Sequence, residues 1–203
     1  MDKARLNMYI RNDLGGIVLA GGESSRMGTD KASMLFRSKP LIEYPLNLLK
    51  KYCNEILISC DKDKFPSYDF RKIPDEIHGK GPLSGIYSCL KASRKPRALV
   101  LGCDMPFVSV KFIKYLIYNS EGYDMALPFH SGHYEPLCGI YSRSLLPVIE
   151  ELFFRGDFSP LSLIPLVKFT KLALSNSNSF YHPKLFYNIN SPADLDTWKE
   201  SSL

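Results

Sequence analysis

The chain has 203 residues, 45% of them hydrophobic and 23% charged, a composition typical of a globular domain with a substantial core. Its 26 Lys and Arg outnumber its 21 Asp and Glu, and the net charge of +5 favours anionic small ligands but is too mild for a nucleic-acid-binding protein. No apolar run approaches the ~20 residues of a membrane span, and residues 1–13 lack the apolar segment of a secretory signal. We therefore expect a cytoplasmic protein with a tail over residues 1–13 and a single domain over residues 14–203.

Strand and helix patterns alternate along the chain. Short apolar runs next to glycine predict buried strands, and apolar residues three to four positions apart predict helices. In chain order, we expect strand 16–20, helix 41–52, strand 55–59, helix 85–92, strand 98–102, helix 111–119, strands 125–128 and 137–141, helix 144–154, strand 169–174, and a helix from Pro192 through Trp198 that Ser191 caps. This alternation predicts an α/β fold with a mostly parallel sheet covered by helices on both faces.

The first predicted strand runs into a glycine-rich loop that carries two cations. Gly21 and Gly22 allow a ligand to approach the backbone closely, and ligands of open parallel sheets bind beyond such strand ends. Arg26 and Lys31 follow and suit the charge of a triphosphate. Neither GxGxxG nor GxxxxGK[ST] occurs, which excludes those two fingerprints. A glycine turn with solvated charges is an adequate alternative for any one residue, but a poor one for the whole string.

A carboxylate follows the strand predicted at 98–102. Asp104 stands just before Pro106, which ends that strand. Mg²⁺ prefers one or two carboxylates together with substrate phosphates, so Asp104 is a candidate Mg²⁺ ligand. The alternative, that Asp104 caps the next helix, is weaker because Ser109 is better placed to do so.

Two further segments carry polar or glycine patterns. Residues 79–85 (GKGPLSG) form a glycine-rich loop that opens a helix, whose N-terminus adds positive potential. Residues 188–195 (NINSPADL) put Asn188 and Asn190 on one face of an extended segment, where their amides can both donate and accept hydrogen bonds.

These segments, LAGGxSxRMGxDK, GPLSG, CDMP and NxNSPADL in that order, resemble the MobA-type nucleotidyltransferases, the molybdenum cofactor guanylyltransferases, from about Gly16 to Leu195. The resemblance implies a Rossmann-like three-layer fold with a mostly parallel central sheet. It also implies an enzyme that transfers GMP from GTP to molybdopterin with Mg²⁺ as cofactor and releases pyrophosphate. The acceptor's terminal phosphate would attack the α-phosphorus in line, so the reaction needs no serine nucleophile and no histidine base.

The resemblance also implies roles for individual residues. The catalytic residues would be Arg26, Lys31 and Asp104, with Asp104 as the metal ligand. The nucleotide-binding residues would be Leu19, Ala20, Gly21, Lys31, Asp75 and Asp104. Asn188 and Asn190 fall where the family handles the acceptor. Glu76 stays open as an alternative to Asp75, and Ser59, where some members carry asparagine, is left unassigned.

Rival functions share part of this pattern. A molybdopterin cytidylyltransferase or a sugar-phosphate nucleotidyltransferase would use the same chemistry, but LAGG in place of LAAG favours guanine within the resemblance. A non-catalytic nucleotide-binding module is disfavoured because Arg26, Lys31 and Asp104 are all present. The expected partners are GTP, molybdopterin and, transiently, cofactor-biosynthesis or acceptor proteins, with neither nucleic acid nor membrane.

The cysteines and histidines do not indicate a metal site or a redox pair in the sequence. The five cysteines are scattered without a CxxC pair and are expected to be small buried hydrophobes. His130, His133 and Glu135 lie within a few residues of one another around a glycine. Because no further ligand is near in sequence, we expect an acceptor-binding or structural role for them rather than a transition-metal site.

Overall fold

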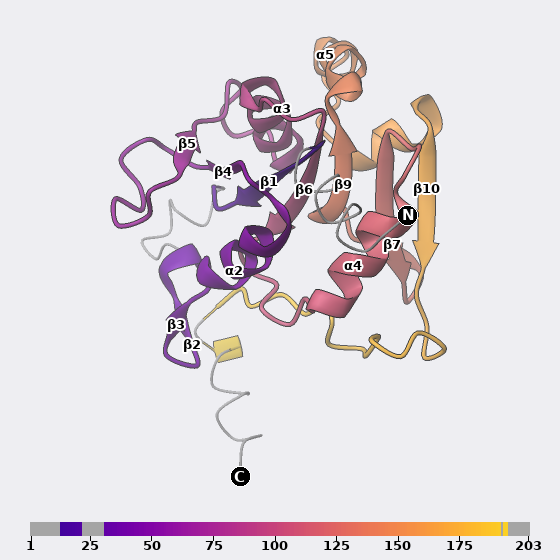
Figure 1. The fold of residues 1–203 in the computed structure, drawn as a ribbon. Coiled ribbons are helices and arrows are strands. Elements are labelled where there is room, and N and C mark those ends of the chain that lie inside the picture. The colour runs from indigo at the N-terminus through magenta and orange to yellow at the C-terminus, as the bar shows by residue number, and fades with distance from the viewer. Residues whose placement is uncertain (1–12, 22–30, 192, 195–203) are drawn as a thin grey trace.

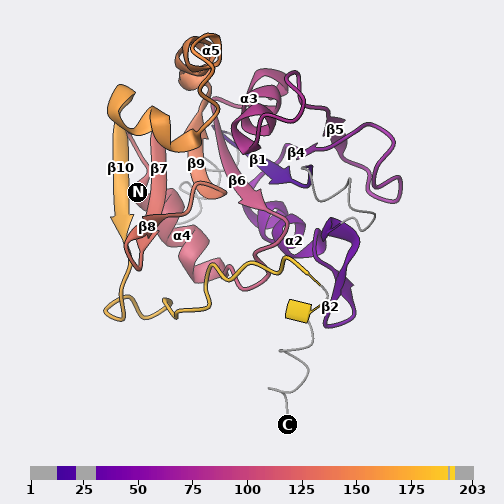
Figure 2. The same cartoon turned by 180° about the vertical axis from the view of Figure 1, so that it is seen from behind.

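A central sheet organises the molecule, seen from opposite sides in Figures 1 and 2. The structure is a computed structural model that describes residues 13–21, 31–191 and 193–194. The eight-stranded sheet has the order β10-β7-β9-β6-β1-β4-β5, and β8 pairs with β7. The strands are β1 (Leu14–Leu19), β4 (Ile56–Ser59), β5 (Arg71–Ile73), β6 (Arg97–Gly102), β7 (Met125–His130), β8 (His133–Tyr134), β9 (Cys138–Ser142) and β10 (Phe169–Ala173).

Most strand pairs in this sheet are parallel, as the sequence predicts. The pairs β1–β4, β1–β6, β4–β5 and β7–β10 run parallel, whereas β9 is antiparallel to both β6 and β7. A strand antiparallel to two neighbours leaves those neighbours pointing the same way. The carboxyl ends of β1, β4, β6 and β7 therefore meet at one edge of the sheet.

Helices cover both faces of the sheet and make three layers. The α-helices are α2 (Glu43–Tyr52), α3 (Pro82–Ala92), α4 (Val110–Asn119) and α5 (Leu146–Phe154). Buried residues of α2 and α4 share one core cluster with Val18 of β1, while those of α3 and α5 share another with Ile17. Because neighbouring residues of β1 point into different clusters, the strand is buried on both faces, which explains its continuous apolar sequence.

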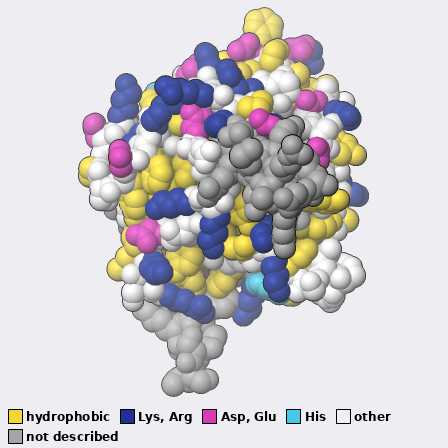
Figure 3. All heavy atoms as spheres, viewed as in Figure 1, with side chains coloured by type: hydrophobic (Ala, Val, Ile, Leu, Met, Phe, Trp, Pro, Cys, Tyr) yellow, Lys and Arg dark blue, Asp and Glu magenta, His cyan; other side chains and the backbone are white. Residues whose placement is uncertain are grey.

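Shorter elements complete the described chain. They are the 3₁₀ turns η2 (Lys31–Ser33), η3 (Arg143–Leu145) and η4 (Pro160–Leu166), and a separate ribbon of β2 (Leu35–Phe36) and β3 (Lys39–Pro40). No helix among the described residues is both long enough and apolar enough to cross a lipid bilayer. The face in Figure 3 shows basic side chains dispersed among apolar and acidic ones.

Local sequence accounts for most element boundaries. Pro45 falls within the first turn of α2, and the Ser109 hydroxyl caps α4 by accepting a hydrogen bond from Phe112 N at 3.2 Å, both as expected. The helix expected over 144–154 instead begins with the η3 turn and becomes α-helical at Leu146. Of the expected C-terminal helix, only residues 193–194 lie in the described part of the chain.

Candidate functional site

The ends of β1, β4 and β6 are joined by backbone hydrogen bonds at the carboxyl edge. Ala20 N donates to Ser59 O at 3.1 Å, and Cys103 N donates to Leu19 O, also at 3.1 Å. Leu19 and Ala20 are buried, while Gly21 is exposed. A Cβ at Gly21 would lie 3.3 Å from Ser59 O, so glycine suits this close backbone crossing. The predicted nucleotide-lining residues 19–21 thus lie at the centre of the sheet's carboxyl edge.

Lys31 connects this edge to the C-terminal segment. Its Nζ donates to Asp104 Oδ2 at 3.1 Å and to Asn190 Oδ1 at 2.6 Å. Ile189 N donates to Asp104 O at 2.9 Å, which holds the asparagine segment against the end of β6. Three predicted site residues that are far apart in sequence are therefore in direct contact, with an ammonium group between a carboxylate and an amide.

Two oxygen atoms of this group have no partner among the described residues. Asp104 Oδ1 and Asn188 Oδ1 are buried, and neither accepts a hydrogen bond within that part of the chain. A Cβ at Gly102 would lie 2.8 Å from Asp104 Oδ1, so the glycine gives the carboxylate its room. Leaving a buried oxygen unpaired costs about 1–3 kcal/mol. A carboxylate oxygen and an amide oxygen are hard donors that fit Mg²⁺.

A second polar group lies at the ends of β4 and β5. Ser59 Oγ donates to Asp75 Oδ1 at 3.0 Å, and a Cβ at Gly85 of α3 would lie 2.4 Å from that hydroxyl. Burial raises the pKa of the Asp75 carboxyl, an effect that Ser59 and His78 oppose and Asp61 reinforces. The pair therefore presents a partly desolvated hydrogen-bond acceptor beside the start of α3.

The structure separates Asp75 from the alternative acid, Glu76. Glu76 Oε2 pairs with Lys91 Nζ at 2.8 Å, and both side chains are about half exposed. Its backbone N–H donates to Ser88 Oγ at 2.9 Å. Glu76 thus faces outward along α3, and Asp75 is the acid that meets Ser59.

The remaining predictions fall on different parts of the site. Asn188 and Asn190 flank Ile189, whose backbone N–H donates to Asp104 O, and their acceptor-binding role stays a prediction. Arg26 lies outside the described residues. Sequence reasoning left Ser59 unassigned and missed the tight contact at Gly85, although Ser59 ends a predicted strand and Gly85 belongs to the GPLSG motif.

Comparisons with known proteins identify the family of this chain. The family model described as MobA-like NTP transferase domain matches residues 16–165. The chain is 35% identical over 182 residues to a probable molybdenum cofactor guanylyltransferase of Pelotomaculum thermopropionicum, covering 89% of each chain. It is 30% identical over 184 residues to the protein of the same name from Carboxydothermus hydrogenoformans, covering 88% of this chain and 91% of the other.

A solved structure extends the likeness to three dimensions. Molybdopterin-guanine dinucleotide biosynthesis protein A from Archaeoglobus fulgidus superposes with a TM-score of 0.74 at 26% identity, covering 92% of this chain and 97% of that one. The superposition shows that the three layers and mostly parallel sheet of this chain belong to a fold that the two proteins share.

Proposed function

Because the chain belongs to the family of MobA-like NTP transferase domains, we propose that it transfers GMP from GTP to molybdopterin and releases pyrophosphate. The names of its relatives in Pelotomaculum thermopropionicum and Carboxydothermus hydrogenoformans support this substrate pair. The observation that carries the proposal is the contact of Lys31 with Asp104 and Asn190 at the carboxyl edge of the sheet. That edge is where open parallel sheets bind their ligands.

The proposed reaction is a substitution at the α-phosphorus of GTP. An oxygen of the acceptor's terminal phosphate forms the new P–O bond, and the bond from the α-phosphorus to the oxygen that bridges it to the β-phosphorus breaks, so that pyrophosphate leaves with the electron pair. The nucleophile is already an anion, so the protein's task is positioning and charge stabilisation. Lys31 would neutralise part of the triphosphate charge, and Arg26 would add a second cation.

Asp104, whose Oδ1 has no partner among the described residues, is the residue that would hold Mg²⁺. When bound, the ion offsets negative charge on the triphosphate and on the departing pyrophosphate. The role of Lys31 differs, because its ammonium is already held by Asp104 Oδ2 and Asn190. It can therefore orient the phosphate chain with little loss of side-chain freedom on binding.

The Asp75–Ser59 pair supports a guanine site. Guanine carries adjacent N–H donors on its Watson–Crick edge, and a carboxylate can accept two of them. The pair lies beside the first turn of α3, where Gly81, with φ of +80°, precedes Pro82. Asn188 and Asn190 belong to the acceptor side of the proposal. A cytoplasmic location and transient contact with cofactor-biosynthesis or acceptor proteins are further parts of it.

The direct test is nucleotidyl transfer by the purified chain to molybdopterin with Mg²⁺, comparing GTP, CTP, ATP and UTP by pyrophosphate release. We expect selective use of GTP. Preference for CTP would contradict the guanine assignment but not the reaction class. Binding of GTP without any pyrophosphate release would contradict the proposed acceptor or the catalytic function.

A further inference from the structure

Two histidines and a glutamate meet on a tight hairpin at the end of β7. Ser131 and Gly132 connect β7 to β8 with φ of 49° and 87°, the positive values that a two-residue type I′ turn requires. His130 and His133 are paired directly across this hairpin. Glu135 follows His133 by two residues, and alternate residues of an extended segment share a face. The β7–β8 hairpin thus presents the side chains of His130, His133 and Glu135 on the same face.

Both imidazoles converge on a single carboxylate oxygen. Glu135 Oε1 lies 2.9 Å from His130 Nε2 and 3.1 Å from His133 Nε2. One ligand atom from each of the three residues falls within 4.8 Å of the others. Two ligands of a tetrahedral Zn²⁺, each about 2.0–2.1 Å from the ion, are ~3.3 Å apart. The donors are therefore close to the spacing that one metal ion requires.

The two nitrogens of the His133 ring face different partners. Nδ1 lies 3.2 Å from Ser131 O, a carbonyl that can only accept a hydrogen bond, and Nε2 faces Glu135 Oε1. A ring that donates from Nδ1 keeps a lone pair on Nε2, which a cation between Nε2 and the carboxylate would use.

Neighbouring side chains hold the His130 ring in the orientation that a metal ligand would need. Its other nitrogen, Nδ1, lies 3.4 Å from the Tyr181 hydroxyl, and its ring packs against Phe186 with centroids 4.8 Å apart. Outer-shell partners of this kind fix the orientation of metal-binding histidines. His130 is buried and Glu135 is partly buried, whereas the His133 side chain is 58% exposed. The cluster is thus held firmly on one side and open to solvent on the other.

We propose that His130, His133 and Glu135 bind one divalent transition-metal ion of the zinc class, with water in the remaining coordination position. Two imidazoles and a carboxylate suit such an ion, whereas Mg²⁺ prefers oxygen ligands alone. The site is separate in sequence and in ligand chemistry from Asp104. The sequence alone favoured an acceptor-binding or structural role because no further ligand is near in sequence, but the hairpin brings the three donors within 4.8 Å of one another.

The test is metal binding by the full chain, first stripped of metal and then held in excess Mg²⁺ to occupy oxygen sites. Zn²⁺ binding is followed by calorimetry, and Co²⁺ binding by its visible absorption. We expect one ion per chain, a rise in Tm with Zn²⁺, and at least a ~10-fold loss of affinity in both His133→Ala and Glu135→Gln. His182→Ala, which removes an exposed histidine outside the cluster, is the matched control and should bind as the parent does.

Two results would overturn the proposal. One is the absence of stoichiometric Zn²⁺ and Co²⁺ binding by the parent chain. The other is equal affinity in the parent, His133→Ala and Glu135→Gln. Asp104→Asn should retain the site, so the result is independent of whether GMP transfer is observed.

Discussion

Asp104 combines two properties that rarely occur together in a purely structural residue. One carboxylate oxygen is held by Lys31 at 3.1 Å, and the other is buried without a partner among the described residues. A structural carboxylate would normally have both oxygens satisfied. We interpret the unsatisfied oxygen as one kept for the ligand.

Asp104→Asn should therefore abolish most activity with little effect on the fold. The amide keeps the shape of the side chain but removes the negative charge that balances Lys31 and would attract Mg²⁺. We expect the rate of pyrophosphate release to fall ~10²–10³-fold, the scale of losing one preorganised electrostatic contact. Asp69→Asn, which alters an exposed aspartate, is the control. Full activity in Asp104→Asn would contradict the metal assignment.

Asp75, unlike Asp104, is a proposed site residue whose ionisation is expected to lower the stability of the fold. Since burial raises its pKa, the folded chain keeps the Asp75 proton to a higher pH than the unfolded chain does. Folding stability therefore falls as pH rises from the ordinary pKa of aspartate through the raised value. Above that window, the ionised carboxylate destabilises the fold.

Asp75→Asn should relieve this cost while keeping an oxygen that accepts from Ser59. We expect the Tm of the variant to exceed that of the parent at about pH 8, and the difference to shrink toward about pH 4 as the parent's carboxyl becomes protonated. Its GTP affinity should fall at the same time. Circular dichroism melts across this range measure the first effect, and a Tm difference that does not vary with pH would exclude the ionisation as its cause.

Residues at strand ends could be predicted from the sequence, but their cross-chain contacts could not. Asp104 comes directly after an apolar run, and Lys31 lies in the loop that leaves another, so both indicate the carboxyl edge. The Ser59–Asp75–Gly85 contact depends on the packing of α3 against β4 and β5, which no local pattern encodes. The choice between Asp75 and Glu76 needed side-chain direction, which sequence spacing does not give.

At the scale of elements, α3 is fitted to the site by one glycine. Gly85 lies inside the helix, where alanine would be favoured by about 1 kcal/mol on intrinsic propensity. Its missing side chain makes room for the Ser59 hydroxyl, which a Cβ would approach to 2.4 Å. Helix propensity thus favours alanine at position 85, whereas the close approach of the Ser59 hydroxyl requires glycine, which is the residue present.

Gly85→Ala should consequently weaken nucleotide binding and lower stability despite its better helix propensity. We expect a fall in Tm and in GTP affinity because the Ser59–Asp75 hydrogen bond must shift. Ser59→Ala removes the clashing hydroxyl, so the double variant Ser59→Ala/Gly85→Ala should recover part of the lost stability. A double-mutant cycle measures this coupling, and strict additivity would contradict direct contact.

Element type followed the sequence wherever burial produced a clear pattern. The runs at 16–20, 55–59 and 98–102 became β1, β4 and β6 because both faces of the inner sheet are covered. The sequence did not predict β5, because Arg-Lys-Ile is mostly charged, as a strand at the edge of the sheet can be. β8 was missed because two residues are too few for a period to register.

At the scale of the whole molecule, one edge of the sheet holds the proposed sites and the opposite edge holds stabilising contacts. The carboxyl edge holds Asp104, Lys31 and, beyond β7, the His130 cluster. The segment after β10 runs along this edge toward β2 (Figure 2), from the contact of Leu174 N with Phe129 O to that of Ile189 N with Asp104 O. One continuous segment therefore contacts both the proposed nucleotide site and the proposed metal site.

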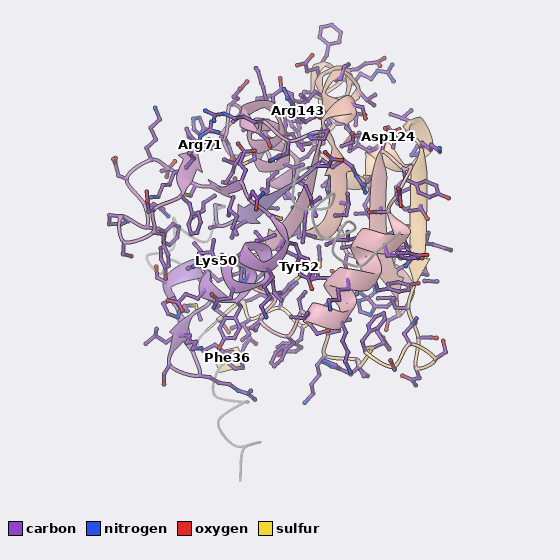
Figure 4. The ribbon with its side chains drawn as sticks, in the orientation of Figure 1. Phe36, Lys50, Tyr52, Arg71, Asp124 and Arg143 are labelled. Atoms are coloured by element: carbon purple, nitrogen blue, oxygen red, sulfur yellow. The ribbon has the colours of Figure 1, made fainter. Side chains whose placement is uncertain are left out.

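The opposite edge is held together by Asp124, which precedes β7. Its Oδ1 accepts from Ser144 Oγ at 2.7 Å, its Oδ2 accepts from Lys168 N at 3.2 Å, and its backbone O accepts from Ser142 N at 2.8 Å. Figure 4 shows Asp124 and Arg143 at this edge, away from the ends of β1 and β6 where the site lies. Asp124 thus links the starts of β7 and β10 to the end of β9 through both its carboxylate and its backbone carbonyl.

Asp124→Ala should affect stability and spare the chemistry. Losing two side-chain hydrogen bonds should cost about 1–3 kcal/mol, which for a domain of this size lowers Tm by roughly 2–4 °C per kcal/mol. GTP affinity and the rate per folded molecule should stay unchanged at a temperature well below the melt, because no bond at the carboxyl edge is altered. Thermal melts and pyrophosphate release on the same sample measure both. A loss of activity without a loss of Tm would show that the two edges are coupled through β7, and that the site depends on the half of the sheet that carries the histidine cluster.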